Sequence, residues 1–464
     1  MSKRRQFKLP SAYTILFSII TLMAILTWIV PAGKYQTEMN PAIGSEVAIS
    51  GTYAPTASNG QGILDIFTAP VVGIQQSIEL GLFILIIGGF LMVITATGAI
   101  DAGIERTVIK MKGREILLIP VLMLLFAAGG TVYGMSEETI PFYMLLLPII
   151  IAAGYDAVTA VAIVMLGAGV GTLGSTINPF ATVIASDASG ISFTDGIILR
   201  CVILAASIIV SIWYVMRYAS KVKKNPAASL VANLKKQNEE HFLGEANTQK
   251  KHEFKGIHKI ILMVFAATFG IMIWGVSSQG WWMTEMSVLF LISSIIVALL
   301  GRLSEEQFVT NFVDGCKDLL GVVLVLGIAR GIGIVMNDGM ITGTILHMGE
   351  TALSDMPPVL FVNVMYWIHA GLSILIPSTS GLAVFSMPIM APLADFAGVG
   401  RELVVTAYQS AAGMVNLVTP TYGVVVAGLA IGRVPLDRWF RFMLPLLLML
   451  AVISMVSLSI AAIL

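Results

Sequence analysis

The sequence predicts an all-α polytopic membrane protein, with about ten transmembrane helices and two re-entrant hairpins in an inverted repeat. Three observations predict this fold class: the composition, the distribution of the basic residues, and an internal repeat. Of the 464 residues, 57% are hydrophobic and only 12% are charged, which excludes a soluble enzyme. The formal net charge of zero argues against a nucleic-acid partner.

Long apolar runs mark the expected membrane spans. The first, residues 12–30, is interpreted as a retained span because it is nearly twenty residues long and lacks a small-residue cleavage site. The later runs cover residues 80–100, 116–153, 156–184, 196–217, 258–277, 284–301, 317–336, 358–396, 401–432 and 440–462.

Two of these runs, 116–153 and 358–396, are too long for single spans. Small and polar residues interrupt each near its middle, at 134–139 (GMSEET) and at 376–381 (IPSTSG). Each run is therefore predicted to enter and leave the membrane on the same side. Irregular backbone at membrane depth must be buried in protein or face a water-filled cavity, so both hairpin tips should line a cavity.

Two further spans are broken, at residues 171–179 (GTLGSTINP) and 416–423 (NLVTPTYG). Proline removes a helical hydrogen bond and forces the preceding residue out of the helical region. The expected helix breaks are therefore at Pro179, Pro420 and, in the second hairpin tip, Pro377. Exposed carbonyls at such breaks suit a coupling cation, which makes sodium a candidate ion for the broken spans.

The basic residues predict the orientation in the membrane. With a cytoplasmic N-terminus, 23 of the 27 lysines and arginines lie at the cytoplasmic face, provided that the two hairpins do not cross. Arg330 is the one that lies deep in a span. The expected topology is therefore a multi-pass membrane protein with its N-terminus in the cytoplasm.

An internal match at offsets of 241 to 244 residues places two units in the chain. The matched pairs are Phe67/Phe308, Gly98/Gly339, Ile100/Ile341, Pro148/Pro392, Gly154/Gly398, Gly171/Gly413, Ala185/Ala427, Gly190/Gly432 and Asp195/Asp437. The expected organisation is a first span with an outer loop (1–64), repeat one (65–218), a cytoplasmic linker (219–257), scaffold spans (258–301) and repeat two (302–464). Loop charges put the two hairpins on opposite sides, so the repeats are predicted to be inverted, as in secondary transporters.

Glu137 and Glu138 are adjacent carboxylates at predicted membrane depth, where an unpaired charge costs about 2.5 to 3.5 kcal/mol. In one interpretation, Ser136 caps the returning half-helix and the glutamates complement its dipole. In the other, at least one glutamate binds a cationic substrate group or carries a coupling proton.

Arg330 takes the place that Gly89 has in the first repeat. Its guanidinium either pairs with a glutamate of the first hairpin or grips a substrate carboxylate through two parallel hydrogen bonds. In the second case, two glutamates and one arginine suit a basic amino acid better than a dicarboxylate.

Hydroxyl, amide and glycine residues at the tips and breaks complete the predicted substrate and ion site. At the second tip, the hydroxyls could instead only satisfy the turn. The candidates besides the three charged residues are Ser136, Thr139, Ser175, Thr176, Asn178, Ser378, Thr379, Ser380, Gly381, Asn416, Thr419 and Thr421.

The two hairpin tips, the segment 387–395 (MPIMAPLAD) and the opening 8–14 (KLPSAYT) resemble the YfcC/DcuC-type carrier family over essentially the whole chain. This family is the anaerobic dicarboxylate-carrier-like branch of the ion-transporter superfamily, and one of its branches is assigned to basic amino acid antiport. The resemblance implies a homodimeric inner-membrane secondary carrier with a scaffold and a mobile transport part. Its members have been assigned dicarboxylates and basic amino acids such as arginine and ornithine.

We therefore expect a secondary active transporter of a basic amino acid, by exchange or ion-coupled uptake, with a four-carbon dicarboxylate carrier as the alternative. No catalytic residue or cofactor is expected beyond a coupling proton or sodium ion, and the partners are a small-molecule substrate and membrane lipid. Two remote alternatives are a channel and an intramembrane hydrolase that would use the hydroxyls near His369. An inverted repeat with two broken spans favours the transporter over both.

Overall fold

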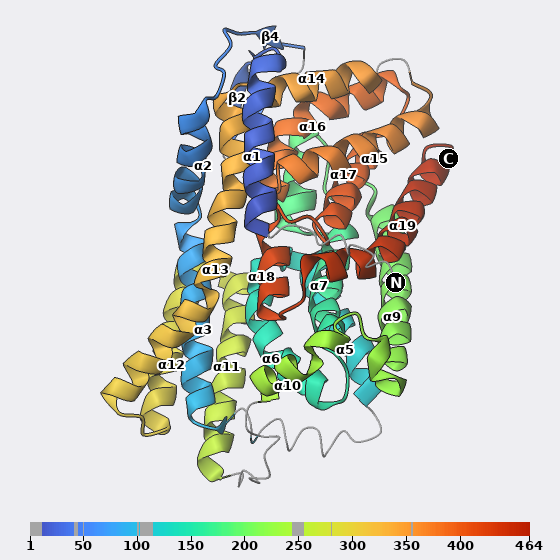
Figure 1. Ribbon diagram of the computed structural model, residues 1–464. Helices are drawn as coiled ribbons and strands as arrows, with labels where there is room; N and C mark the ends of the chain where they lie inside the picture. Colours follow the sequence, from blue (N-terminus) through green and yellow to red (C-terminus); the bar gives the residue numbers. More distant parts are fainter. Residues whose placement is uncertain are drawn as a thin grey trace, which may run out of the picture.

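The computed structural model describes residues 12–40, 45–49, 51–99, 102, 115–243, 255–279, 281–353 and 356–464, and these are mostly helical (Figure 1). Residues 106–114, which carry four of the basic residues counted at the cytoplasmic face, and part of the predicted linker lie outside the described residues. The α-helices are α1 (Ala12–Ile29), α2 (Ile63–Gln76), α3 (Ile78–Ala96), α5 (Leu118–Tyr133), α6 (Ile140–Ala152), α7 (Ala157–Leu173), α8 (Ile184–Ala188), α9 (Ile197–Lys224), α10 (Lys235–Leu243), α11 (Gly256–Gln279), α12 (Met283–Leu300), α13 (Glu305–Asp338), α14 (Thr342–Leu353), α15 (Pro358–Leu375), α16 (Thr379–Phe396), α17 (Arg401–Val415), α18 (Gly423–Ile431) and α19 (Leu436–Ala461).

Within the described residues, seven helices are long and apolar enough to cross a membrane: α3, α5, α9, α12, α13, α15 and α19. Four shorter apolar helices lie in α1, α2, α7 and α11. The all-α polytopic class is therefore confirmed. The number of spans and the re-entrant course of the hairpins stay predictions.

The repeat is visible in the order and bounds of the helices. Helices α2 and α3, separated only by Ser77, begin and end at Ile63 and Ala96, and α13 begins and ends 242 residues later. The apolar runs predicted here, 80–100 and 317–336, are shorter than these stretches, and α2 with its Pro70 lies before the first of them. In the structure, each repeat instead starts with one long helical stretch.

These equivalent stretches run antiparallel, side by side (Figure 1). A Cβ atom at Gly88 would lie 2.4 Å from the carbonyl oxygen of Gly315, and one at Gly315 would lie 2.2 Å from that of Gly88. Near the other end, a Cβ atom at Gly73 would lie 2.1 Å from the carbonyl oxygen of Gly327. The partner number falls as the residue number rises, which is the geometry of an inverted repeat.

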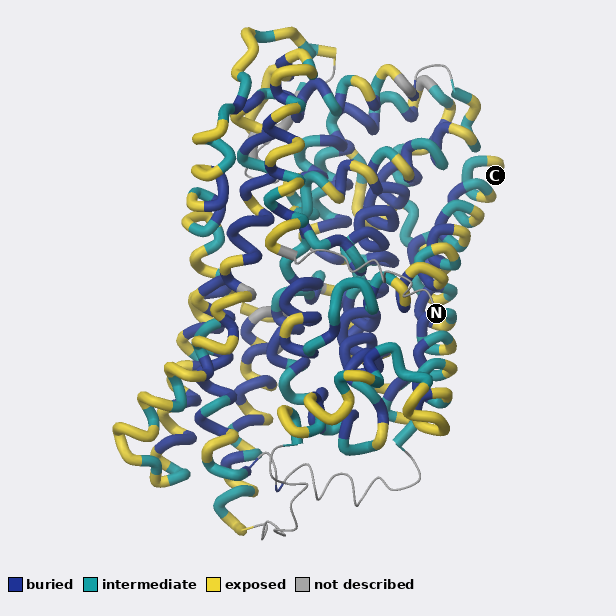
Figure 2. Tube along the Cα trace, in the orientation of Figure 1, coloured by how far each residue is buried: buried dark blue, intermediate teal, exposed yellow. Residues whose placement is uncertain are grey.

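Clusters of buried side chains group the helices into two bodies that are packed against each other. The largest cluster packs α5 to α9 with α15 to α19, which we call the hairpin body, and a few residues of α3 and α13 also join it. Two smaller clusters pack α3 with α11 and α12, and α1 with α2 and α13; we call these helices the scaffold. Helices α7 and α17, at the centre of the hairpin body, are buried along almost their whole length (Figure 2). By packing, α2, α3 and α13 belong with the first span and the spans near 258–301 that were predicted as scaffold, and the immobility of this group stays a prediction.

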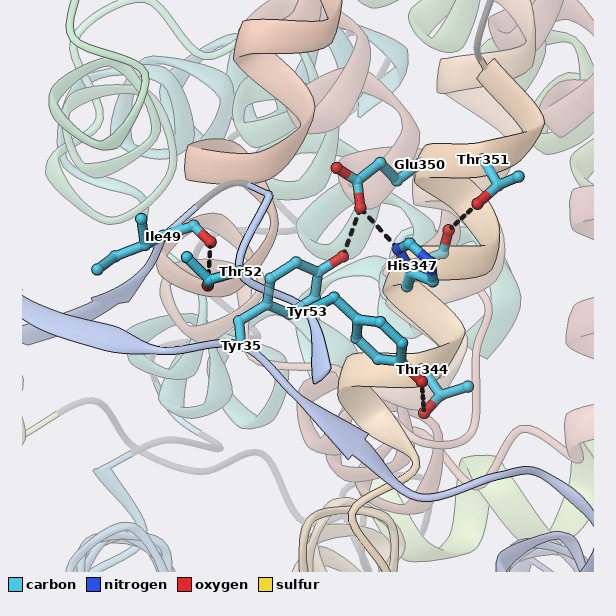
Figure 3. A network of polar contacts seen from close by, with 8 residues as sticks. All are labelled: Tyr35, Ile49, Thr52, Tyr53, Thr344, His347, Glu350 and Thr351. Carbon is cyan, nitrogen blue, oxygen red and sulfur yellow. Dashed lines mark hydrogen bonds and ion pairs between the residues drawn. The ribbon is translucent and has the colours of Figure 1, made fainter. Parts of the chain in front are cut away.

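The loop after α1 forms two short antiparallel pairs, β1 (Gly33–Lys34) with β4 (Ala54–Pro55) and β2 (Thr37–Asn40) with β3 (Ser45–Ala48). It is fixed to α14 by a polar network, drawn in Figure 3. Tyr35 donates to Glu350 at 2.7 Å, His347 Nδ1 lies 2.9 Å from the same carboxylate oxygen, and Tyr53 stacks on His347. Burial, with the adjacent Glu350, raises the pKa of Tyr35, so its hydroxyl stays protonated and can donate.

Candidate functional site

A cavity of about 890 Å³ lies between the scaffold helices α2 and α13 and the tips and breaks of the hairpin body. It brings together residues that are far apart in the chain. The predicted site residues that line it are Ser136, Glu137, Glu138, Asn178, Arg330, Pro377, Ser378, Thr379, Ser380, Gly381 and Thr421.

The remaining predicted residues are not among those that line the cavity. Most of their polar groups bond inside the hairpin body: Thr139 to the Ser136 carbonyl at 2.5 Å, Ser175 to Thr182 at 2.5 Å, Thr176 to Thr131 at 3.0 Å and Thr419 to Thr421 at 2.8 Å. Asn416 differs, because its buried Oδ1 has no hydrogen-bond partner among the described residues. The breaks lie where proline predicts them: a single π-helical turn, Pro179–Val183, follows the first, and Pro420 lies between α17 and α18.

The first tip is built on Gly134, which ends α5 in the left-handed conformation with φ 77°. A Cβ atom there would lie 2.6 Å from Oδ1 of Asn178, so glycine lets the first break pack against the first tip. Asn178 Oδ1 also accepts the backbone N–H groups of Phe180 and Ala181, at 2.8 and 3.2 Å. Asn178 thus holds the turn and lines the cavity at once.

The two glutamates differ in their surroundings. Glu138 is buried, with 3% of its surface exposed, and its Oε2 accepts the backbone N–H of Ser136 at 2.9 Å. Glu137 is only partly buried and faces the same cavity. The side chain of Ser136 does not cap the following turn; its hydroxyl instead contacts that of Tyr422. Glu138 is thus bonded to the backbone of this tip, whereas Glu137 is the glutamate with part of its surface exposed at the cavity.

Arg330 comes from the scaffold helix α13 and is exposed to the cavity. Its Nε donates to Gln76 Oε1 at 3.4 Å. Among the ion pairs of the described residues, none joins Arg330 to Glu137 or Glu138. The guanidinium is thus held in place by a neutral amide, with most of its donors left for another group.

The second tip presents the start of a helix to the cavity. Ser378 Oγ accepts the backbone N–H of Gly381 at 3.2 Å and so caps α16. The residues of this first turn line the cavity, and the N-terminus of a helix carries a partial positive charge. This tip and Arg330 are the two places where a carboxylate group would be favoured.

Several residues of this region were missed from the sequence. Asp65 and Asp338 line the scaffold side of the cavity, but each looks like an ordinary polar residue near a helix end. Tyr408, Gln409 and Tyr422 bond to predicted site residues from within the buried helix α17 and the break after it. A polar Gln inside an apolar span was the one available signal.

The charged residues of the cavity are unevenly divided by sign. Of those that line it within the described residues, four are acidic and one is basic. The acidic side chains are those of Asp65, Glu137, Glu138 and Asp338, and the basic one is that of Arg330. Within the described chain, no group of three or more His, Cys, Asp or Glu side chains could hold a metal ion.

A membrane-embedded helical fold with a polar cavity between two bodies is typical of membrane transporters. The sequence profile of the DcuC family, described as C4-dicarboxylate anaerobic carriers, matches residues 9–463. The chain therefore belongs to the DcuC family and is a membrane transporter.

Two relatives match nearly the whole chain. An uncharacterized protein of Haemophilus influenzae strain Rd is 36% identical, covering 96% of this chain and 95% of its own. YfcC of Escherichia coli strain K12, whose name proposes a basic amino acid antiporter, is 27% identical, covering 97% and 96%.

Two solved structures are also similar. MtrF of Neisseria gonorrhoeae, from a class of antimetabolite efflux pumps, has a TM-score of 0.43 at 16% identity, covering 97% of this chain and 95% of its own. The YdaH transporter of Alcanivorax borkumensis has a TM-score of 0.40 at 16% identity, covering 97% and 98%. Both likenesses are too weak to assign a shared mechanism.

Proposed function

We propose that this protein is a secondary active transporter of a basic amino acid of the arginine or ornithine type, working by alternating access and exchange. The observation that carries the proposal is the composition of the cavity, in which acidic side chains outnumber the single Arg330 by four to one. A substrate with a side-chain cation is attracted to such a surface. The name of the YfcC relative supports the same substrate class.

Two charged groups of a basic amino acid, the side-chain cation and the α-carboxylate, have candidate partners in this proposal. The side-chain cation meets Glu137, whose carboxylate is partly exposed, and the α-carboxylate meets Arg330 or the first turn of α16. Because Glu137 belongs to the hairpin body and Arg330 to the scaffold, movement of the one against the other would expose the site to each side in turn.

A four-carbon dicarboxylate is the second candidate. The description of the family favours it, and Arg330 with the capped N-terminus of α16 could bind two carboxylates. The excess of acidic residues opposes it, because at least some of the four must then be protonated or neutralised by a coupling cation.

The coupling ion is proposed to be a proton or sodium. A glutamate in the cavity could carry a proton. The unpartnered, buried Oδ1 of Asn416 at the second break is an uncharged oxygen ligand suitable for sodium. We further propose that the carrier is a homodimer of the bacterial inner membrane, with its N-terminus in the cytoplasm.

Counterflow tests the substrate. Purified protein is reconstituted in vesicles preloaded with unlabelled arginine, ornithine or fumarate, and uptake of labelled arginine and labelled fumarate is followed at neutral pH. We expect transient accumulation of arginine in vesicles loaded with arginine or ornithine, and none in protein-free vesicles. Accumulation of fumarate without that of arginine would establish the dicarboxylate alternative instead, and imposed proton or sodium gradients identify the coupling ion.

A further inference from the structure

Helix α17 carries two consecutive residues that bond to two different parts of the site. Its residues from Leu403 to Val415 are all buried, so it lies inside the hairpin body rather than on the cavity wall. Tyr408 reaches the second hairpin tip, and Gln409 reaches the first break. No other described helix is hydrogen-bonded through side chains to both of these segments.

Gln409 uses both ends of its amide. Its Oε1 accepts the hydroxyl of Thr182 at 2.7 Å, and its Nε2 donates to the carbonyl of Ser175 at 2.9 Å. Ser175 and Thr182 also bond to each other, at 2.5 Å. All three side chains are buried, and a buried polar group that loses its partner is costly. The first break is therefore fixed to α17 by a closed network.

Tyr408 fixes the other segment. Its hydroxyl donates to the carbonyl of Thr379 at 2.5 Å, and its ring packs edge-on against His369. Thr379 is the first residue of α16, so this bond orients the turn that faces the cavity. A shift of Thr379 would move the cap formed by Ser378 and the backbone N–H groups beside it.

The break after α17 completes the connections. Tyr422, which lines the cavity, bonds through its hydroxyl to Ser136 at the first tip. Thus α17 and the break that follows it contact the first break and both tips. The first break and the first tip belong to the first repeat, more than two hundred residues earlier in the chain.

We propose that Tyr408 and Gln409 are positioning residues, which set the distance between the two halves of the substrate site without touching the substrate. The proposal builds on the transport function proposed above, but its geometric part holds for any cargo of the cavity. Removing either bond should loosen the cavity wall and weaken substrate binding, while the conformational cycle of the hairpin body continues.

Tyr408→Phe is the sharpest variant, because it removes one hydroxyl and keeps the ring. A control of the same kind is Tyr214→Phe, since Tyr214 also donates to a backbone carbonyl, that of Phe442, at 2.6 Å and away from the cavity. In arginine counterflow, we expect Tyr408→Phe to raise KM about 2- to 10-fold with Vmax nearly unchanged, and Tyr214→Phe to change neither. Gln409→Leu should likewise raise KM.

A second measurement needs no substrate. In a chain with Cys201 and Cys316 replaced by serine, Ser380→Cys reports access to the second tip through its rate of labelling by a water-soluble thiosulfonate. Tyr408→Phe should change this rate at least about 2-fold relative to the Tyr214→Phe control.

If wild-type vesicles show no arginine counterflow, the proposed substrate is wrong, and the labelling rates alone then decide the positioning role. Unchanged labelling in both the Tyr408 and Gln409 variants, or equal KM changes in Tyr408→Phe and Tyr214→Phe, would overturn it.

Discussion

Glu137 and Glu138 are adjacent in the chain but differ in burial and hydrogen bonding. Glu138 accepts a backbone N–H and is buried, whereas Glu137 is partly exposed to the cavity. We predict that Glu137→Gln lowers arginine counterflow by about 10- to 150-fold, the loss expected for a hydrogen-bonded charge. Glu138→Gln should have a smaller effect, because the amide oxygen can still accept from Ser136.

Initial rates of counterflow at equal amounts of reconstituted protein measure both variants. Full activity of Glu137→Gln would contradict the assignment, as would an equal loss in the two single variants. Size-exclusion profiles in detergent show whether either protein is misfolded.

Arg330 offers a test of the substrate carboxylate. We predict that Arg330→Gln weakens arginine binding by about 10-fold or more, because one charge-assisted pair is lost. Agmatine, which is arginine without its carboxylate, should compete equally well in the wild type and the variant. The inhibition constants of both compounds give the answer, and an equal loss for both would show that Arg330 does not bind the carboxylate.

At the residue scale, sequence reasoning found the groups whose chemistry is unusual in a membrane. A charged side chain at membrane depth is costly and therefore indicates a function. Glu137 and Arg330 are two such residues, and both line the cavity. Ser175 and Thr176 were expected to be ligands but bond inside the hairpin body. A hydroxyl can satisfy itself on nearby backbone or neighbouring hydroxyls, so its direction depends on packing that one sequence does not contain.

The crossing of α3 and α13 depends on glycine at the element scale. We predict that Gly88→Ala and Gly315→Ala each lower stability by about 1 to 3 kcal/mol, because each new Cβ atom would meet a backbone carbonyl that cannot move aside. Gly270→Ala is the matched control: nothing lies within 4 Å of its Cβ position, and alanine favours the helix. Thermal unfolding in detergent compares the three, and an unchanged midpoint in both crossing variants would contradict the prediction.

The polar network of Figure 3 holds the loop after α1 to α14. We predict that Tyr35→Phe, which removes the hydroxyl bonded to Glu350, speeds proteolysis of this loop about 10-fold, since bonds to charged groups are the stronger ones. Limited proteolysis of the native protein, with Tyr214→Phe as the control, measures the effect. Equal cleavage rates would show that the network does not anchor the loop.

Elements were predictable where glycine and proline interrupt apolar runs. The tips at 134–139 and 376–381 separate α5 from α6 and α15 from α16, and the breaks follow α7 and α17 closely. The apolar run 80–100 located α3 but not the full extent of the α2–α3 stretch, because α2 is short and amphipathic. Its helical state is stabilised by packing on α13 rather than by its own sequence.

On the scale of the whole molecule, the loop of β1 to β4 and the helix α10 lie at opposite ends (Figure 1). We predict that Lys236→Cys in α10 reacts only with reagents that reach the cytoplasm, and that Ser58→Cys reacts from outside. Both positions are exposed, so labelling of intact cells and inverted vesicles distinguishes the two faces. The reverse pattern would mean that the basic residues do not orient this chain.

The charge of the cavity has a consequence for the step in which the empty carrier reorients. If all four carboxylates are ionised, the site without substrate carries a net charge of −3, since Arg330 offsets one of them. Enclosing such a site in the low-dielectric interior is unfavourable, and a bound cation lowers that cost. The unloaded protein should therefore reorient more slowly than the loaded one. Substrate present on the opposite side of the membrane should accelerate transport.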